Sequence, residues 1–226
     1  MDSRTFGRST IDLPVLDSPD ISLSPVSSLE GGRGGVQGFR YGEVRLRELD
    51  LADVRLVTGR ISGLVAERVR FEEVGMDSVE LDGCDLGGLG WSGGRLSRVV
   101  FRGCKLMGAA FGQLRLDSVL FEDCKLDYAS FDQVRAGGAL GFVRCSLREA
   151  AFERCDLSGV HVEGCDLRLT EFGGGTYRDA DLRGNDLAEV RGVCALSGVI
   201  IDRPQQSELG HALMAELGIV FGDTLG

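Results

Sequence analysis

The chain has 226 residues, including 34 Gly, 4 Pro, 7 Cys and 2 His, with a formal charge of −10 at pH 7. This length suits one domain or two, and a hydrophobic content of 43% is too high for a disordered acidic tail. The acidic balance disfavours direct binding to nucleic acid or to an anionic membrane. We find neither an apolar run of about 18 residues nor an N-terminal signal sequence, so we expect a cytoplasmic protein.

Residues 1–35 differ in composition from the rest of the chain. They contain Pro14, Pro19, Pro25 and the run Gly31-Gly32-Arg33-Gly34-Gly35. One interpretation is an N-terminal leader that is partly disordered. The alternative is a segment that packs on the first coil of the next region through its apolar residues, namely Ile11, Leu13, Val15, Leu16, Ile21 and Leu23.

Residues 36–197 repeat with a period of five. An apolar residue recurs at every fifth position from Tyr41 to Ala136, and after one extra residue within 137–141 the pattern resumes from Phe142 to Leu187. A second inward residue lies two positions before each and is almost always Val, Cys, Ala, Leu, Gly or Thr, and the residue between the two is often polar. This alternation predicts a short extended segment, after which two residues must turn a corner. Gly fills the fifth position of eleven of the thirty units, which explains much of its excess.

These units resemble the motif Ala-(Asp/Asn)-Leu-x-x of the pentapeptide repeat family. Close matches are Ala180-Asp181-Leu182 and the Cys-Asp-Leu units that begin at Cys84, Cys155 and Cys165. The resemblance implies an all-β fold, a right-handed quadrilateral parallel β-helix with four units per coil. Residues 20 apart support four sides independently, since aromatic residues recur at that spacing: Phe71, Trp91, Phe111 and Phe131. We therefore expect about 7–8 coils in a rod roughly 35 Å long.

Residues 198–226 are expected to form a C-terminal cap with a short α-helix. Pro204 ends the repeat, an apolar helical face begins near Ser207, and Gly218 is placed to stop the helix. The apolar run Ile219-Val220-Phe221 comes next. In the topoisomerase-binding branches of the resembled family, such an element joins two rods. We expect a homodimer, with a monomeric cap as the alternative, and the candidate cap or dimer residues are Leu209, Leu213, Met214, Leu217 and Ile219.

The sequence offers no catalytic constellation. His161 and His211 have no second His to pair with, and no phosphate-binding loop or nucleophile motif is present, so we expect neither enzymatic activity nor a cofactor. Stacked cysteines raise the alternatives of a zinc site or of disulfides between coils. However, there is no Cys-x-x-Cys pair, and inward side chains on one face cannot surround a metal ion. We expect no metal and interpret these residues as reduced thiols that fill the interior: Cys84, Cys104, Cys124, Cys145 and Cys165.

The outward positions then carry the function. One face of the expected rod has seven acidic residues against Arg70 and Arg154, a net charge of −5, while its neighbour has a net charge of +2. One branch of the resembled family, the quinolone-resistance and self-immunity proteins, protects DNA gyrase by mimicking DNA. The resemblance thus implies a non-catalytic partner of gyrase or another type II topoisomerase. The alternative is a scaffold for another cytoplasmic protein. The candidate interaction residues are Asp50, Asp53, Glu72, Glu73, Asp132, Glu153 and Glu171.

Overall fold

Two parallel sheets wind around one rod in the computed structural model, which describes residues 2–31 and 35–220. The first sheet has the order β17-β15-β12-β10-β8-β6-β4-β3, with β14 beside β12. Its strands are β3 (Ser24–Pro25), β4 (Val36–Gly42), β6 (Arg55–Ser62), β8 (Gly75–Asp82), β10 (Arg95–Arg102), β12 (Arg115–Glu122), β14 (Arg135–Ala136), β15 (Leu140–Val143) and β17 (His161–Glu163).

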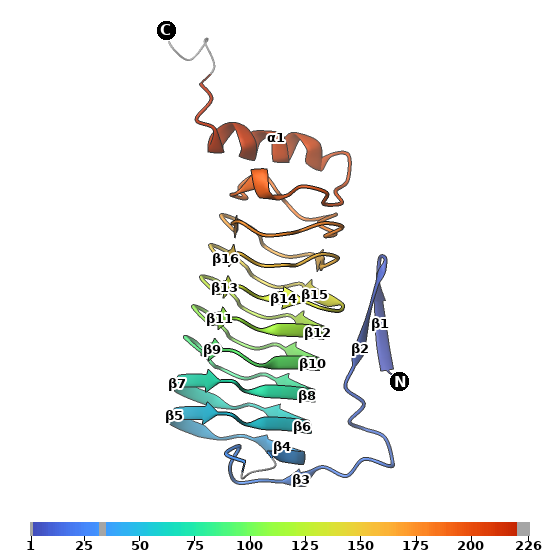
Figure 1. The fold of residues 1–226 in the computed structure, drawn as a ribbon, viewed down its shortest axis with the longest axis vertical. Helices are drawn as coiled ribbons and strands as arrows, with labels where there is room; N and C mark the ends of the chain where they lie inside the picture. The colour runs from blue at the N-terminus through green and yellow to red at the C-terminus, as the bar shows by residue number, and fades with distance from the viewer. Residues whose placement is uncertain (1, 32–34, 221–226) are drawn as a thin grey trace.

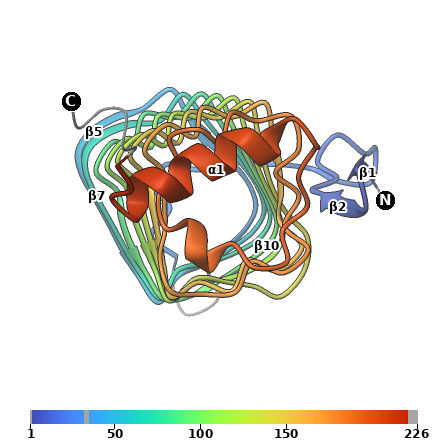
Figure 2. The ribbon, with the colours of Figure 1, turned by 90° about the horizontal axis from the view of Figure 1, so that it is seen from above.

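The second sheet has the order β18-β16-β13-β11-β9-β7-β5. Its strands are β5 (Arg45–Ala52), β7 (Val65–Glu72), β9 (Gly90–Ser92), β11 (Ala110–Gly112), β13 (Ser130–Asp132), β16 (Ala151–Glu153) and β18 (Glu171–Phe172). Seen from above, the coils superpose as a four-sided tube (Figure 2). The predicted fold class, an all-β parallel β-helix with a C-terminal helix, is confirmed, with about seven coils.

The pairing register follows the sequence period. Leu96 lies opposite Leu116, 20 residues later, whereas Val119 lies opposite Leu140, 21 residues later. The extra residue therefore enters the rod between Ala136 and Leu140, within the segment where the sequence pattern shifts. Every later coil keeps the four-sided arrangement, because a single residue is absorbed at one corner.

The interior consists of side-chain ladders. Phe101 stacks on Phe121 with ring centroids 4.6 Å apart, and Phe121 stacks on Phe142 at 5.0 Å. The Trp91 indole is buried and donates from Nε1 to the Val74 carbonyl at 3.3 Å. Each buried Phe contributes about 1.5–3 kcal/mol of transfer free energy. Because each residue gains this stabilisation only when its neighbours above and below are in place, the rod is stable as a stack of coils.

The corners adopt left-handed backbone conformations. Nine of the eleven glycines at predicted fifth positions have positive φ, but so do Glu73, Arg98 and Tyr128, at 51°, 51° and 61°. Corners therefore favour Gly without requiring it at every coil. Gly94 is different, because its φ is 106° and an added Cβ would lie 2.3 Å from the Val74 carbonyl oxygen. At this corner only Gly fits.

The N-terminal residues lie on the outside of the rod. Strands β1 (Asp2–Phe6) and β2 (Ser9–Leu13) form an antiparallel hairpin that runs beside the coils (Figure 1). The hairpin contacts β10 and β12 rather than the first coil, so its placement differs from both alternatives considered for residues 1–35. Only later leader residues reach the first coil, where β3 pairs with β4 and Leu29 is buried. The physical reason is an apolar cluster between the hairpin and outward positions of the rod: Phe6, Ile11, Leu13, Val100, Leu120 and Val143.

The C-terminal helix closes the last coil. After a 3₁₀ turn, η1 (Val193–Ala195), helix α1 (Gln205–Glu216) crosses the opening of the tube (Figures 1 and 2). Gln205 is buried, and its Nε2 donates to the carbonyls of Leu182 and Asn185 at 2.9 and 2.7 Å. The Glu208 carboxylate accepts from the Leu187 amide at 3.0 Å. The bonds to the Asn185 carbonyl and the Leu187 amide provide partners for backbone groups at the end of the last coil.

The helix begins at Gln205, two residues before the expected Ser207, and Gly218 follows its end with a φ of 63°. Phe221, the last residue of the predicted apolar run, lies outside the described residues. Within residues 2–31 and 35–220, no helix has the length and apolar character needed to cross a membrane.

Candidate interaction site

The seven predicted acidic residues all belong to the second sheet or follow its strands directly. They form two groups at opposite ends of that sheet. We call Asp50, Asp53, Glu72 and Glu73, on β5 and β7, the N-terminal acidic patch. We call Asp132, Glu153 and Glu171, on β13, β16 and β18, the C-terminal acidic patch.

A neutral stretch separates the two patches. In register, Glu72 lies opposite Ser92, Ser92 opposite Gly112, and Gly112 opposite Asp132. Three strand spacings separate Glu72 from Asp132, roughly 14 Å, and duplex DNA would present about eight phosphate charges over that length. The acidic face is therefore two patches rather than the continuous stripe that a net charge of −5 suggests.

The two patches differ in compensation and exposure. Arg154 donates to the Asp132 carboxylate, and both Asp132 and Glu153 are half-buried. All four carboxylates of the N-terminal acidic patch are exposed, and in register Asp50 lies opposite Arg70. The N-terminal acidic patch is consequently the stronger concentration of negative charge on this sheet.

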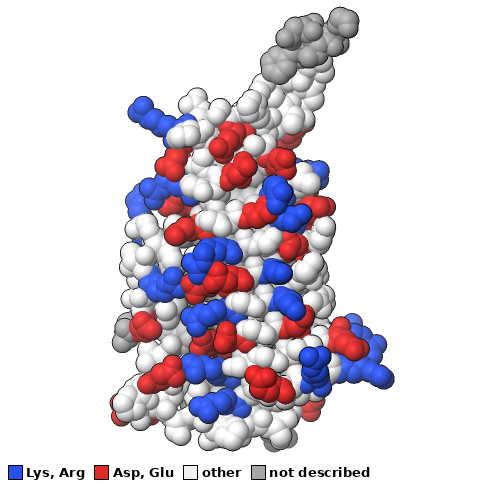
Figure 3. Space-filling model, turned by 180° about the vertical axis from the view of Figure 1, so that it is seen from behind, with Lys and Arg blue, Asp and Glu red and all other residues white. Residues whose placement is uncertain are grey.

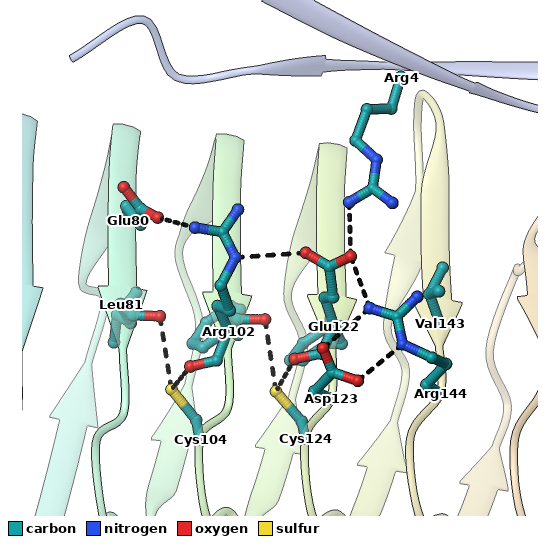
Figure 4. A network of polar contacts seen from close by, with 12 residues as sticks. Arg4, Glu80, Leu81, Arg102, Cys104, Glu122, Asp123, Cys124, Val143 and Arg144 are labelled. Atoms are coloured by element: carbon teal, nitrogen blue, oxygen red, sulfur yellow. Dashed lines mark hydrogen bonds and ion pairs between the residues drawn. The ribbon is translucent and has the colours of Figure 1, made fainter. Parts of the chain in front are cut away.

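Elsewhere the surface is mixed in sign. Viewed from behind, acidic and basic side chains interleave along the rod (Figure 3). A ladder of alternating charges accounts for part of this on the first sheet: Arg60, Glu80, Arg102, Glu122 and Arg144. We call this set the charge ladder, and Figure 4 shows its central members. Sequence analysis missed it, although acids and arginines that alternate at spacings of 20 to 22 residues are a usable signal.

Glu122 is the centre of the charge ladder. Its carboxylate accepts from Arg102 at 3.2 Å, from Arg144 at 2.9 Å and from Arg4 of the hairpin at 2.5 Å. Burial alone would raise the pKa of Glu122, but the hydrogen bonds from the three guanidinium groups outweigh it and lower the pKa to about 2. Arg4 thereby fastens the hairpin to a carboxylate that is charged at neutral pH (Figure 4).

His161, expected at an outward repeat position, is covered by the hairpin. Its ring stacks under Phe6 with centroids 5.2 Å apart, and its Nε2 lies 3.0 Å from the Glu163 carboxylate. The buried Nδ1 has no hydrogen-bond partner among the described residues, and the nearest carboxylate, that of Asp181, is 3.7 Å away. His161 therefore serves the docking of the hairpin. Across residues 2–31 and 35–220, no group of three or more potential metal ligands occurs.

The thiols lie inside the coils. Six of the seven cysteines are buried and free, while Cys194 is exposed. The Cys104 thiol donates to the carbonyls of Leu81 and Arg102 at 3.5 and 3.4 Å (Figure 4). Burial raises the pKa of Cys155 to about 11. Neutral, hydrogen-bonded thiols in such a setting pack as small apolar side chains.

The candidate cap and dimer residues fall into two groups. Leu209 packs against the core, and Leu213 and Met214 are half-buried. Leu217 and Ile219 are exposed by 60% and 51%. Leu209 therefore belongs to the cap, while Leu217 and Ile219, together with exposed Val220, form an apolar end that the described residues do not cover.

Comparison with known proteins identifies the repeat in part of the chain. The family model of pentapeptide repeats matches residues 145–184, with eight copies. In sequence, no curated protein matches the chain. Solved structures similar to the chain include a trypsin-treated form of QnrB1, a plasmid-mediated fluoroquinolone resistance protein, at 18% identity and a TM-score of 0.43, covering 81% of this chain and 100% of that one. HetL, a pentapeptide repeat protein involved in heterocyst differentiation regulation from the cyanobacterium Nostoc sp. strain PCC 7120, matches at 18% identity and a TM-score of 0.44, covering 72% of this chain and 87% of that one.

The matched segment is continuous with the rest of the rod. It contains β16, β17 and β18, which pair in register with the strands of the coils before them. The five-residue unit and the four-sided coil extend from β4 through β18 without a change of architecture. Residues 145–184 are therefore pentapeptide repeats, and the predicted resemblance to the pentapeptide repeat family is confirmed.

Proposed function

We propose that this rod is a non-catalytic binding protein that presents its N-terminal acidic patch to the basic DNA-binding groove of a type II topoisomerase such as DNA gyrase. The observation that carries the proposal is the four exposed carboxylates on two adjacent strands. A groove that recognises phosphates attracts such a patch, and charge complementarity accelerates and orients the encounter. Occupying the groove would protect the enzyme from topoisomerase poisons, and this partner would place the protein in the cytoplasm.

The density of charge in the patch supports this partner. Two adjacent strands occupy roughly 10 Å of the rod, a length in which duplex DNA presents about six phosphate charges. With four carboxylates over this length, the patch has a charge density closer to that of duplex DNA than the rod as a whole has. Mimicry is thus local, confined to the end of the rod near β5 and β7.

The apolar end formed by Leu217, Ile219 and Val220 supports a homodimer. Their exposed side chains would be buried between two copies, and two rods joined end to end would carry two N-terminal acidic patches. We expect Leu217→Asp to halve the mass measured by light scattering. Leu213→Asp tests the half-buried neighbour of this end, and an unchanged mass in both variants would contradict a dimer of this kind.

A gyrase assay with charge-reversed variants tests the proposal. The wild-type protein is expected to inhibit supercoiling and to reduce quinolone-stabilised DNA cleavage. Reversing Asp53, Glu72 and Glu73, three exposed carboxylates of the N-terminal acidic patch, to Lys is expected to raise the half-effective concentration at least tenfold, because three attractive charges become repulsive. The matched control reverses Glu149, Glu163 and Glu189, three exposed glutamates outside the second sheet, by the same total charge. Equal effects of the two triple variants would show that net charge, and not the acidic face, is responsible.

A scaffold for another protein is the second candidate. The neutral stretch on β9 and β11 and the mixed charges of Figure 3 favour it, since a partner of mixed charge would match such a surface. If a folded wild-type protein at micromolar concentration changes neither supercoiling nor quinolone-stabilised cleavage, gyrase is not the partner. The scaffold role then stands in its place.

A further inference from the structure

We propose that Arg95, Arg115 and Arg135 form a binding site for a phosphate group on the face of the rod next to the acidic one. We call this site the arginine groove. The three residues begin strands β10, β12 and β14. The inference is independent of the proposed topoisomerase partner, because it concerns a different face and the opposite charge.

The first observation is the register. Arg95 lies directly opposite Arg115, and Arg115 directly opposite Arg135, on strands about 4.8 Å apart. Like charges directly opposite one another destabilise a sheet. In the charge ladder, the same strands β10 and β12 pair opposite charges, since Arg102 faces Glu122. The stacked arginines thus carry an electrostatic cost that the rod avoids a few residues further along.

The second observation is the incomplete neutralisation of these charges. Arg95 donates to the Asp117 carboxylate at 3.2 Å. Arg115 and Arg135 are exposed, and neither forms an ion pair with a residue in the described parts of the chain. Asp156 lies opposite Arg135 in the next coil, but its carboxylate accepts hydrogen bonds from Ser158, so the two neighbouring guanidinium groups remain without an ion pair among the described residues.

The third observation is a groove between these side chains. A cavity of about 250 Å³ is lined by the three arginines together with Leu116, Asp117 and Gly137. Leu116 is buried, and the Gly137 amide donates to its carbonyl at 2.8 Å. Gly137 brings no side chain into the space beside Arg115 and Arg135, at the corner where the rod takes up its extra residue.

The chemistry of the groove fits a phosphate dianion. A guanidinium group binds phosphate through two parallel N–H donors, and arginine is the preferred residue for such forked contacts. Two uncompensated positive charges match the two negative charges of a phosphate monoester or of free phosphate near neutral pH. Asp117 holds Arg95 at the edge of the groove, which leaves Arg115 and Arg135 to converge on the ligand. The phosphate could be free or carried by a phosphorylated side chain, because the groove is open to solvent.

Titration of the full-length protein with inorganic phosphate at low ionic strength tests the site. Two charge-assisted contacts predict a dissociation constant on the order of 1 mM by calorimetry. Arg115→Gln and Arg135→Gln are each expected to weaken binding at least tenfold. Arg70→Gln, which removes an exposed arginine on the acidic face, is expected to leave binding unchanged.

A second readout separates binding from folding. Without phosphate, Arg115→Gln is expected to raise the melting temperature, because it removes repulsion from both neighbours. Phosphate is expected to raise the melting temperature of the wild type but not that of Arg115→Gln, since only a binding-competent native state gains from the ligand.

A phosphoserine peptide in parallel identifies the source of the phosphate. Binding of the peptide tenfold tighter than inorganic phosphate would assign a phosphorylated side chain, and equal binding would assign free phosphate. Any of three results would overturn the site: no phosphate binding at tens of millimolar, equally tight binding of acetate, or an equal loss of binding in Arg70→Gln.

Discussion

Gly141→Ala tests the seat of the N-terminal hairpin with a single methyl group. Gly141 lies between Leu120 and His161 in the outward row of the first sheet. An added Cβ would lie 2.7 Å from Cδ1 of Ile11 and 3.2 Å from Cδ1 of Leu120. The backbone of Gly141 is not left-handed, so alanine brings no conformational penalty of its own. Most of any loss of stability is therefore expected from the closer contact, which is with Ile11 of the hairpin.

Gly141→Ala is expected to lower the free energy of unfolding by about 1–3 kcal/mol, the usual cost of overpacking. The loss cannot exceed the free energy of hairpin docking, because the hairpin can leave the rod instead. Ile11→Ala removes the nearer of the two atoms that the new methyl group meets. In the Ile11→Ala background, Gly141→Ala is therefore expected to cost less than about 0.5 kcal/mol, which gives a coupling of about 1–2.5 kcal/mol between the two sites.

Urea denaturation of the wild type, both single variants and the double variant measures this coupling. Trypsin cleavage after Arg4 and Arg8 should accelerate in Gly141→Ala, because a hairpin that leaves the rod exposes its backbone. The control is Gly112→Ala, whose added Cβ would meet only the Trp91 carbonyl oxygen at 3.9 Å and which should change stability by less than about 0.5 kcal/mol. Equal costs of Gly141→Ala with and without Ile11 would refute the docking of the hairpin on this row.

Three further predictions concern the corners, the charge ladder and the thiols. Gly103 has a φ of 59° and no atom within 4 Å of an added Cβ, so Gly103→Ala should lower the free energy of unfolding by about 1 kcal/mol in denaturation experiments. Gly94→Ala should lower it by more than about 3 kcal/mol, because the new Cβ meets the Val74 carbonyl. Similar losses in the two variants would contradict the difference between an open and a closed corner. The folded-state pKa of Glu122 lies at about 2, below its ordinary value of 4.5, so its stabilising contribution is fully present above pH 4.5 and is lost as the pH falls toward 2. Glu122→Gln should remove this part of the pH dependence of stability, and an unchanged acid limb in urea midpoints would contradict the role of the charge ladder. In native protein, only the exposed Cys194 should react rapidly with a thiol reagent, and the six buried cysteines should react at the rate of unfolding; fast reaction of a second thiol would show that the coils open locally.

The coil could be predicted because its information is local and repeated. The position of a residue within its five-residue unit predicts whether its side chain faces inward. Residues 20 apart, such as Phe101 and Phe121, must stack if the rod has four sides. The hairpin could not be predicted in the same way. Many of its contacts join residues more than 100 positions apart, as Arg4 and Glu122 show. Val100 and Leu120 look like ordinary variation at outward positions until their partners are known.

The placement of the seven acidic residues on one sheet was predictable, but their layout along it was not. The phase of the repeat fixes which side chains share a sheet, and so the seven acidic residues could be assigned together. Summing their charge concealed the neutral positions Ser92 and Gly112, which separate the two patches. The pairing of Arg154 with Asp132 depends on side-chain conformation, which a repeat pattern does not encode.

The docked hairpin changes what kind of folding unit the chain is. A solenoid of coils makes contacts only between neighbours, so its ends can fray independently and its folding can begin at any coil. Here the first residues of the chain bind a surface that exists only once β10, β12 and β15 are stacked. The hairpin must therefore dock late, and once docked it resists the separation of the middle coils. We expect the middle of the rod to exchange its amide hydrogens more slowly than either end, and the start of the chain to be the last part to become ordered.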